Sequence, residues 1–84
     1  MEIKASQLRN GLEVDSFFGK INVNRGRYTL KFDSEAKEYM VIKVTFALIQ
    51  QPEKTETIFK STDFLRTLHT YNMLSKESDK GIND

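Results

Sequence analysis

The sequence predicts an α+β domain, in which a small antiparallel sheet of four to five strands is packed by one C-terminal helix. Three observations lead to this prediction. Tyr39–Gln51 is the longest run of β-branched and aromatic residues, Arg27–Phe32 alternates apolar and polar side chains, and apolar residues recur at helical spacing from Phe64 onward. Whether the sheet curls toward a barrel is left open, as is whether the first 23 residues complete it.

Length and composition limit the architecture to one domain. A chain of 84 residues has room for a single core, predicted to span residues 1–75, followed by a solvated charged tail over residues 76–84. Cysteine is absent, which excludes disulfides and thiolate metal ligands. No apolar run reaches the roughly 18 to 20 residues of a membrane span, and the first residues do not resemble a signal peptide. We therefore expect a soluble, cytoplasmic protein.

The first part of the chain predicts a turn and one strand. Asn10-Gly11 is a turn dipeptide that closes either a short helical turn over Ala5–Asn10 or a loop into the first strand. A strand is predicted over Asp15–Val23, with Gly19 as a bulge or bend. Its two faces would carry Phe17, Ile21 and Val23 on one side and Phe18, Lys20 and Asn22 on the other. Asn24–Gly26 is expected to form a hairpin loop, with positive φ at Gly26.

The next two strands carry the clearest alternation. Arg27–Phe32 is predicted to point Tyr28, Leu30 and Phe32 inward, and the polar Asp33–Glu38 connects it to the long strand Tyr39–Gln51. The wholly apolar side of the long strand, predicted to face the core, is Met40, Ile42, Val44, Phe46 and Leu48. The opposite side mixes Tyr39, Val41, Lys43, Thr45, Ala47 and Ile49, which suits a face that is partly covered or used for binding.

A fourth strand and a helix complete the predicted domain. Pro52 ends the long strand, and Thr55–Lys60 follows with two alternatives for its inner face: Ile58 with charged neighbours, or Phe59 with two threonines. Ser61–Asp63 predicts a helix start, with Asp63 in the first turn. The apolar stripe is expected to comprise Phe64, Leu65, Leu68 and either Tyr71 or Asn72, and the helix to end near residues 74–76.

Enzyme motifs are not evident. The glycines are scattered, so no phosphate-binding loop occurs, and His69 is interpreted as an ordinary residue at the margin of the helical stripe. The carboxylate pairs Glu35–Glu38 and Glu53–Glu56 fall in polar contexts typical of solubility. We therefore predict a non-enzymatic protein without cofactor or metal.

Charge distribution suggests a nucleic-acid partner. The formal charge is only +1, but no acid occurs between Asp15 and Asp33. If the apolar sets face the helix, the opposite sheet face gathers cations for phosphates and aromatic rings for bases. The predicted binding residues for single-stranded nucleic acid are Phe18, Lys20, Arg25, Arg27, Lys31, Tyr39 and Lys43. The alternative is that these are ordinary solvent-facing residues of half-buried strands.

A second hypothesis is a protein partner. Apolar area on the outer side of the long strand would then mediate homodimerisation or docking on a larger protein, as in an interaction module or small inhibitor. The residues predicted for this interface are Val41, Ala47, Ile49 and Phe59. The sequence does not decide whether the binding partner is DNA, RNA or protein.

The predicted order of elements resembles a known family. Four antiparallel strands followed by a helix, introduced by Ile58-Phe-Lys-Ser-Thr-Asp-Phe-Leu65, look like the positive cofactor four family of single-stranded DNA-binding coactivators. Arg27–Phe32, Tyr39–Gln51 and Thr55–Leu74 follow that family's order. The resemblance implies single-stranded DNA binding and a dimer formed by the C-terminal helix. It is a resemblance of topology, and no individual binding residue is transferred from it.

Overall fold

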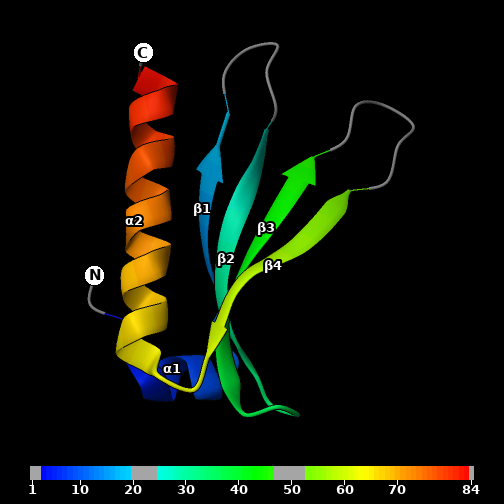
Figure 1. Ribbon diagram of the computed structural model, residues 1–84, viewed down its shortest axis with the longest axis vertical. Coiled ribbons are helices and arrows are strands. Elements are labelled where there is room, and N and C mark those ends of the chain that lie inside the picture. The colour runs from blue at the N-terminus through cyan, green and yellow to red at the C-terminus, as the bar shows by residue number, and fades with distance from the viewer. Residues whose placement is uncertain (1–2, 20–24, 47–52, 84) are drawn as a thin grey trace.

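The protein is a four-stranded antiparallel sheet with a long helix against one face (Figure 1). The computed structural model describes residues 3–19, 25–46 and 53–83, with side chains described up to residue 76. The elements are α1 (Ala5–Arg9), β1 (Val14–Phe18), β2 (Arg25–Asp33), β3 (Glu38–Phe46), β4 (Lys54–Ser61) and α2 (Phe64–Asn83). The sheet order is β1-β2-β3-β4 and the sheet is not closed. The predicted fold class is confirmed.

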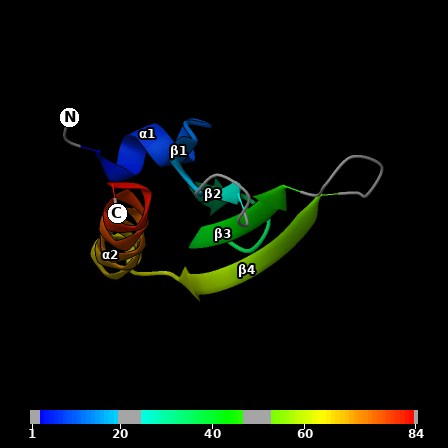
Figure 2. The same ribbon diagram turned by 90° about the horizontal axis from the view of Figure 1, so that it is seen from above.

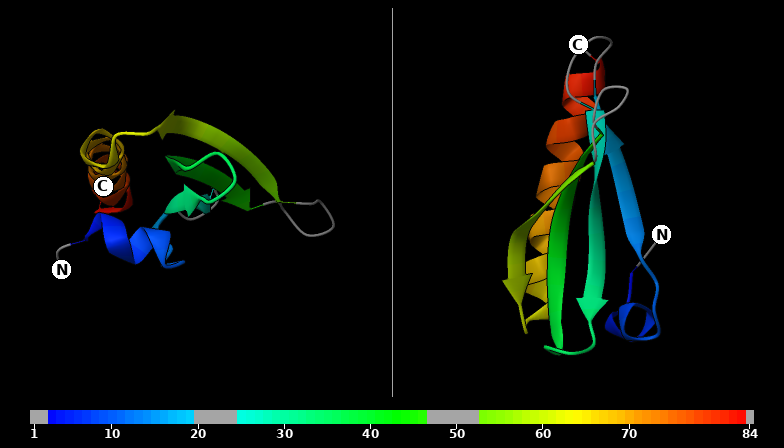
Figure 3. Two further views of the ribbon diagram at one scale, coloured as in Figure 1. Left: turned by 90° about the horizontal axis from the view of Figure 1, so that it is seen from below. Right: turned by 90° about the vertical axis from the view of Figure 1, so that its right-hand side faces the viewer.

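One face of the sheet is covered by α2 and the other is left uncovered by helix (Figures 2 and 3). We call these the α2 face and the open face. Directly opposed residues of antiparallel strands point to the same side of the sheet. Leu30 lies opposite both Val14 and Val41, and Val41 lies opposite Phe59, so this row marks the α2 face.

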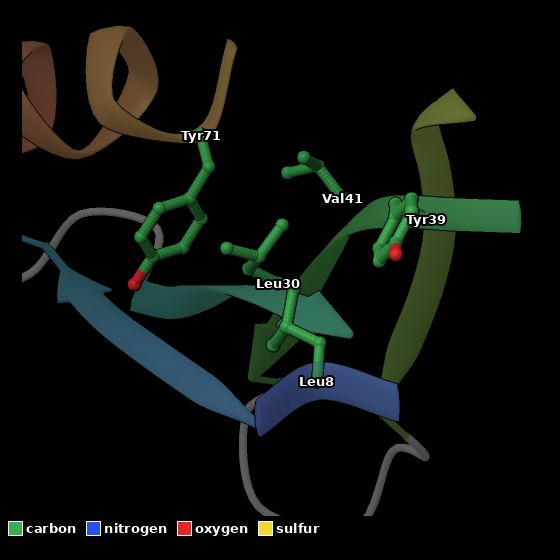
Figure 4. Packing of buried hydrophobic residues seen from close by; sticks show 5 residues of the cluster. All are labelled: Leu8, Leu30, Tyr39, Val41 and Tyr71. Carbon is green, nitrogen blue, oxygen red and sulfur yellow. The ribbon is translucent and has the colours of Figure 1, made fainter. Parts of the chain in front are cut away.

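The core lies between the α2 face and the two helices. Leu8 of α1 and Tyr71 of α2 point toward Leu30 and Val41 (Figure 4). Leu8 is 1% exposed, and Leu30 and Val41 are fully buried. Gly11, at φ 100°, ends the α1 turn and donates its N–H to the Leu8 carbonyl at 3.0 Å. Of the two alternatives for Asn10-Gly11, a helical turn or a loop, the structure has the helical turn, and it closes one end of the core.

A chain of hydroxyl groups joins α2 to the edge strand β1. The Ser16 and Tyr71 hydroxyl oxygens lie 2.7 Å apart, and the Ser75 hydroxyl donates to Ser16 Oγ at 2.8 Å. Tyr71 is 3% exposed, so its polar tip needs such a partner. These bonds fix the helix against β1 and set its rotation about its axis.

The predicted faces of β3 are wrong. Met40, Ile42 and Val44 were expected against the helix, but they point to the open face together with Phe46. Tyr39 and Val41, expected outside, are 7% and 0% exposed within the α2-face core. The physical reason is that a central strand is buried on both sides, so apolarity does not choose a face. The register Leu30↔Val41 makes that choice.

The chain around β1 and β2 also differs from prediction. β1 ends at Phe18, and positions 20–23 of the predicted strand, like Leu48 of the long strand, lie outside the described residues. Gly26 belongs to β2 rather than to a hairpin loop, and positive φ occurs at Gly11 and Gly19 instead. A side chain at Gly26 would collide with the Val44 carbonyl oxygen and the Phe18 ring. The glycine is required for close approach, not for a turn.

A bulge at Ile58 resolves the ambiguity of β4. Phe59 lies opposite Val41, whereas Thr57 lies opposite Ile42, so Ile58 is an extra residue between them. Phe59 therefore packs on the α2-face core while Thr55 and Thr57 point to the open face. Of the two predicted alternatives, the one with Phe59 on the inner face is right about Phe59 and wrong about the two threonines, because it assumed an uninterrupted alternation of period two.

The helix α2 begins after Asp63, which caps it. Asp63 Oδ1 accepts the backbone N–H groups of Leu65 at 3.1 Å and Arg66 at 3.4 Å, and Ser61 Oγ accepts the Asp63 N–H at 3.0 Å. The helix begins directly after the predicted segment Ser61–Asp63, but Asp63 precedes the first turn rather than lying in it.

Two other predictions for α2 are wrong. Leu65 is 72% exposed, and the buried positions Thr67 and Tyr71 define the packed stripe, which excludes Asn72. The helix runs to Asn83, past the predicted end near residues 74–76 and through the predicted tail. Once a helix is nucleated, each further residue adds a backbone hydrogen bond, so loss of the apolar period does not end it.

Candidate functional site

The open face is a side of the sheet against which neither helix of the described residues packs. Cross-strand register arranges its side chains in two rows from β1 to β4, Phe17–Arg27–Val44–Thr55 and Asp15–Thr29–Ile42–Thr57, and one row from β2 to β4, Lys31–Met40–Lys60. Arg25 lies opposite Phe46 beyond the first row. The face thus combines a central apolar column on β3 with cations on β2 and hydroxyl groups on β4.

One corner of the open face is aromatic. Phe17 is 60% exposed, and its ring centroid lies 6.3 Å from that of Phe46. The guanidinium carbon of Arg27 lies 5.5 Å from the Phe46 centroid, a cation–π distance. We call Phe17, Arg27 and Phe46 the aromatic corner. It offers an exposed ring face with a cation beside it.

Next to the aromatic corner the open face is hollowed, with a volume of about 290 Å³. Ile42 and Val44 contribute apolar side chains to the hollow, and Thr29 and Thr55 contribute hydroxyl-bearing ones. Glu13 and Lys31 line it as well, so both signs of charge reach it. The hollow can accept a flat, partly polar group held against the exposed ring.

The cations of the open face follow β2, and the acids border them. Among the residues that the structure describes, the one ion pair joins Lys60 Nζ to Asp33 Oδ2 at 3.7 Å. Asp15 Oδ1 accepts the Thr29 hydroxyl at 2.6 Å on the β1 side. Arg25, Arg27 and Lys31 therefore have no acidic partner in the described ranges, and they lie on one side of one strand. This line of cations is available to an anion.

The turn between β2 and β3 holds Asp33 as a carboxylate. Its Oδ1 accepts the backbone N–H groups of Ala36 at 3.3 Å and Glu35 at 3.0 Å. The Ala36 N–H is the largest cause that lowers the pKa of Asp33 below its ordinary 3.8, and the Glu35 N–H and Lys60 lower it further. Asp33 consequently keeps the turn closed and stays charged at neutral pH.

The predicted nucleic-acid residues do not all share a face. Arg25, Arg27 and Lys31 lie together on the open face. Phe18 and Lys43 lie on the α2 side of the sheet, where Lys43 Nζ is 5.6 Å from the Phe18 ring centroid. The grouping of these two with the β2 cations is wrong, because Phe18 lies opposite Gly26 in the β1–β2 register and Lys43 lies opposite Tyr28 in the β2–β3 register, both on the α2 side.

Two further predicted positions are not available on the open face. Tyr39 is buried, with its ring 5.0 Å from Phe32 and 5.3 Å from Phe64 by centroids, so it belongs to the core and not to an outer surface. Lys20 lies outside the described residues. The described part of the predicted site therefore reduces to the β2 cations on the open face.

The predicted protein interface is not an outer surface where the structure describes it. Val41 is fully buried and Phe59 packs against the α2-face core, while Ala47 and Ile49 fall outside the described residues. Val41 and Phe59 face α2 because both share a cross-strand row with Leu30. They complete the core within one copy of the chain.

Sequence reasoning missed Phe17, Phe46 and Lys60 as open-face residues. One signal could have found Phe46, whereas the place of Phe17 depends on the β1–β2 register. If the polar connection closes symmetrically, with Asp33 opposite Glu38, then Phe32 lies opposite Tyr39 and Leu30 opposite Val41, as the structure shows. That register moves Phe46 to the open face beside Arg25. Lys60 could not have been placed, since the bulge at Ile58 reverses the alternation before it.

Other classes of site find no support among the described residues. No group of three or more His, Cys, Asp or Glu side chains in that part of the chain could hold a metal ion, and His69 is exposed on α2. No helix in the described ranges is both long and apolar enough to cross a membrane. No family model, curated protein or solved structure matches the chain.

Proposed function

We propose that the protein binds single-stranded nucleic acid on the open face. Arg25, Arg27 and Lys31 would contact backbone phosphates, and a base would stack on Phe17 at the aromatic corner. The observation that carries the proposal is Phe17, a phenylalanine 60% exposed on a polar surface, with a cation and a second ring beside it. An aromatic face exposed in this way is what a base requires for stacking.

The composition of the open face supports this ligand over an apolar protein surface. Met40 and Ile42 are each 8% exposed and Val44 is 5% exposed, so the apolar column offers little area to a partner. A protein interface of ordinary size would need a broader accessible patch. The accessible groups are instead cations, hydroxyl groups and one ring, which suit phosphates and bases, with the acids Glu13 and Asp15 at the β1 border.

The acids of this face shape the expected path of the strand. Asp15 and Glu13 stand at the β1 side, so phosphates are expected to follow β2 and avoid that border. Bases can then turn toward Phe17 or into the hollow beside it. Such binding has little sequence preference, because stacking and phosphate contact are shared by all bases.

Fluorescence anisotropy with labelled single-stranded DNA and RNA tests the proposal. Binding is expected at low salt and should weaken as salt rises, because bound phosphates release counterions. Phe17→Ala should weaken binding by about 1–3 kcal/mol at fixed salt, the usual loss for one stacked base. Arg27→Gln and Lys31→Gln should each reduce the slope of the salt dependence.

The matched control is Lys43→Gln, which removes the same charge from the α2 side of the sheet. It should leave affinity nearly unchanged. An equal loss in Lys43→Gln would mean that binding follows net charge and not the open face. Absence of binding by the unmodified protein at low salt would refute the proposal.

A further inference from the structure

The edge strand β4 presents an unpaired backbone. It pairs with β3 on one side, and in the described ranges no strand pairs with its other side. Residues 53–58 are all exposed, and the β3–β4 end of the sheet turns away from α2 (Figures 1 and 2). An edge of this kind displays N–H and C=O groups that can pair with another strand. Neither helix stands in the way of such a strand.

We propose that β4 pairs with β4 of a second copy of the chain, antiparallel and about a two-fold axis at Thr55. This register sets Lys54 of each copy opposite Glu56 of the other, and Thr55 opposite Thr55. Opposed charges and paired threonines both stabilise neighbouring antiparallel strands. A two-fold axis uses the same segment twice, so the segment must complement itself, and Lys54-Thr55-Glu56 does.

Two alternative registers are disfavoured by charge. An axis at Thr57 would bring Lys54 opposite Lys60, and an axis at Glu56 would bring the two Glu56 carboxylates together. Like charges directly opposed destabilise a strand pair. The bulge at Ile58 also ends the straight part of the edge, so pairing is confined to the residues before it. The Thr55 axis is the register that these features leave.

Pairing in this way would join two open faces into one surface. Thr55 points to the open face in the row of Phe17, Arg27 and Val44, so that row would continue through Thr55 of the second copy. The two aromatic corners would then lie on the same side of a continuous sheet. The inference concerns the edge alone and stands whether or not the open face binds nucleic acid.

Charge reversal with rescue tests the pairing. Sedimentation velocity and light scattering over a concentration series are expected to show a monomer–dimer equilibrium for the unmodified protein. Lys54→Glu places a glutamate against Glu56 of the other copy, and Glu56→Lys places a lysine against Lys54 of the other copy. Because like charges then face each other, each variant alone should dissociate at least about tenfold more readily. An equimolar mixture of the two variants restores opposite charges in both pairs and should form a heterodimer.

The controls separate pairing from loss of fold. Glu56 lies opposite Lys43 within its own chain, so Glu56→Lys is checked by circular dichroism and thermal unfolding. Association of the mixture cannot arise from unfolding of either variant. Lys60→Glu, beyond the bulge, should leave the dimer intact. A monomeric unmodified protein at millimolar concentration, variants that dimerise normally, or a mixture that stays monomeric would each overturn the proposal.

Discussion

The two faces of β3 reach similar burial by different means. On the α2 face, Val41 is 0% exposed because helices cover it. On the open face, Ile42 is only 8% exposed although no helix lies over it. Thr29 and Thr57 lie beside it, and Arg27 and Lys31 line the same hollow as Ile42. The long stems of arginine and lysine shield apolar surface while their charged ends stay in water.

Burial on the α2 face stabilises the fold, whereas burial on the open face only determines the form of a surface. Side chains on the α2 face interlock with a second layer, so removing one leaves a cavity. Side chains at the rim of the open face border solvent, which fills any space that a substitution leaves. The same strand can therefore serve as core on one side and as the base of a binding surface on the other.

The largest difference in the free energy of unfolding is expected between substitutions of Leu30 and of Phe17. Leu30→Ala should lower the free energy of unfolding by about 2–5 kcal/mol, because Leu30 is fully buried between β-strands and α2. Phe17→Ala should change it by less than about 0.5 kcal/mol, since Phe17 is mostly exposed. Urea unfolding followed by circular dichroism measures both values. Similar losses in the two variants would show that the open face is also structural.

A smaller difference in stability is expected between substitutions that remove a hydroxyl group from each of the two faces. Tyr71→Phe removes the bond to Ser16 and should cost about 1 kcal/mol, because the hydroxyl is enclosed between α2 and β1. Thr29→Val removes the bond to Asp15, whose exposed carboxylate regains water, and should cost less. Chemical denaturation under identical conditions compares them. A larger loss of stability in Thr29→Val than in Tyr71→Phe would show that the hydroxyl group on the open face contributes more to the fold than the one on the α2 face.

The smallest expected effect is a pH dependence of the protein's stability that comes from Asp33 at the end of β2. Because its pKa in the folded protein lies below 3.8, its ordinary value, its charged form is favoured by folding. That stabilisation is present above pH 3.8 and is lost as the pH falls through the lower folded value. Thermal unfolding of the unmodified protein and Asp33→Asn between about pH 2 and 6 should show a narrower gap at the acid end. Parallel curves would exclude the effect.

The sequence predicted the architecture because period-two and helical patterns are local. Arg27–Phe32 falls within β2 with the expected inward residues, and Ser61–Asp63 lies at the helix start. The face of β3 could not be predicted from its own residues, since both sides are apolar enough to be buried. It depends on the pairing of Leu30 with Val41, which is a non-local property set by the connecting turn.

The candidate site was predictable only along β2. Arg25, Arg27 and Lys31 lie on one strand, so their shared side follows from alternation alone. To place a residue of β1 or β3 on the same face as these cations, the pairing register of the strands must be known. Without it, Phe18, Tyr39 and Lys43 were wrongly grouped with the cations and Phe46 was omitted. Single-stranded nucleic-acid binding and the resemblance to the positive cofactor four family stay predictions.

The bulge at Ile58 makes the two halves of β4 separately adjustable. Phe59 is tied to the core, whereas the side chains of Lys54 to Thr57 are exposed at the edge of the sheet, with Thr55 and Thr57 on the open face and Lys54 and Glu56 on the α2 side. The extra residue absorbs the change of face between them, so the outer segment can be rewritten without shifting Phe59. If β4 pairs with a second copy as proposed, exchanging Lys54-Thr55-Glu56 for other complementary residues would give several variants of the chain, each of which associates only with its matching variant while the sheet and core stay the same.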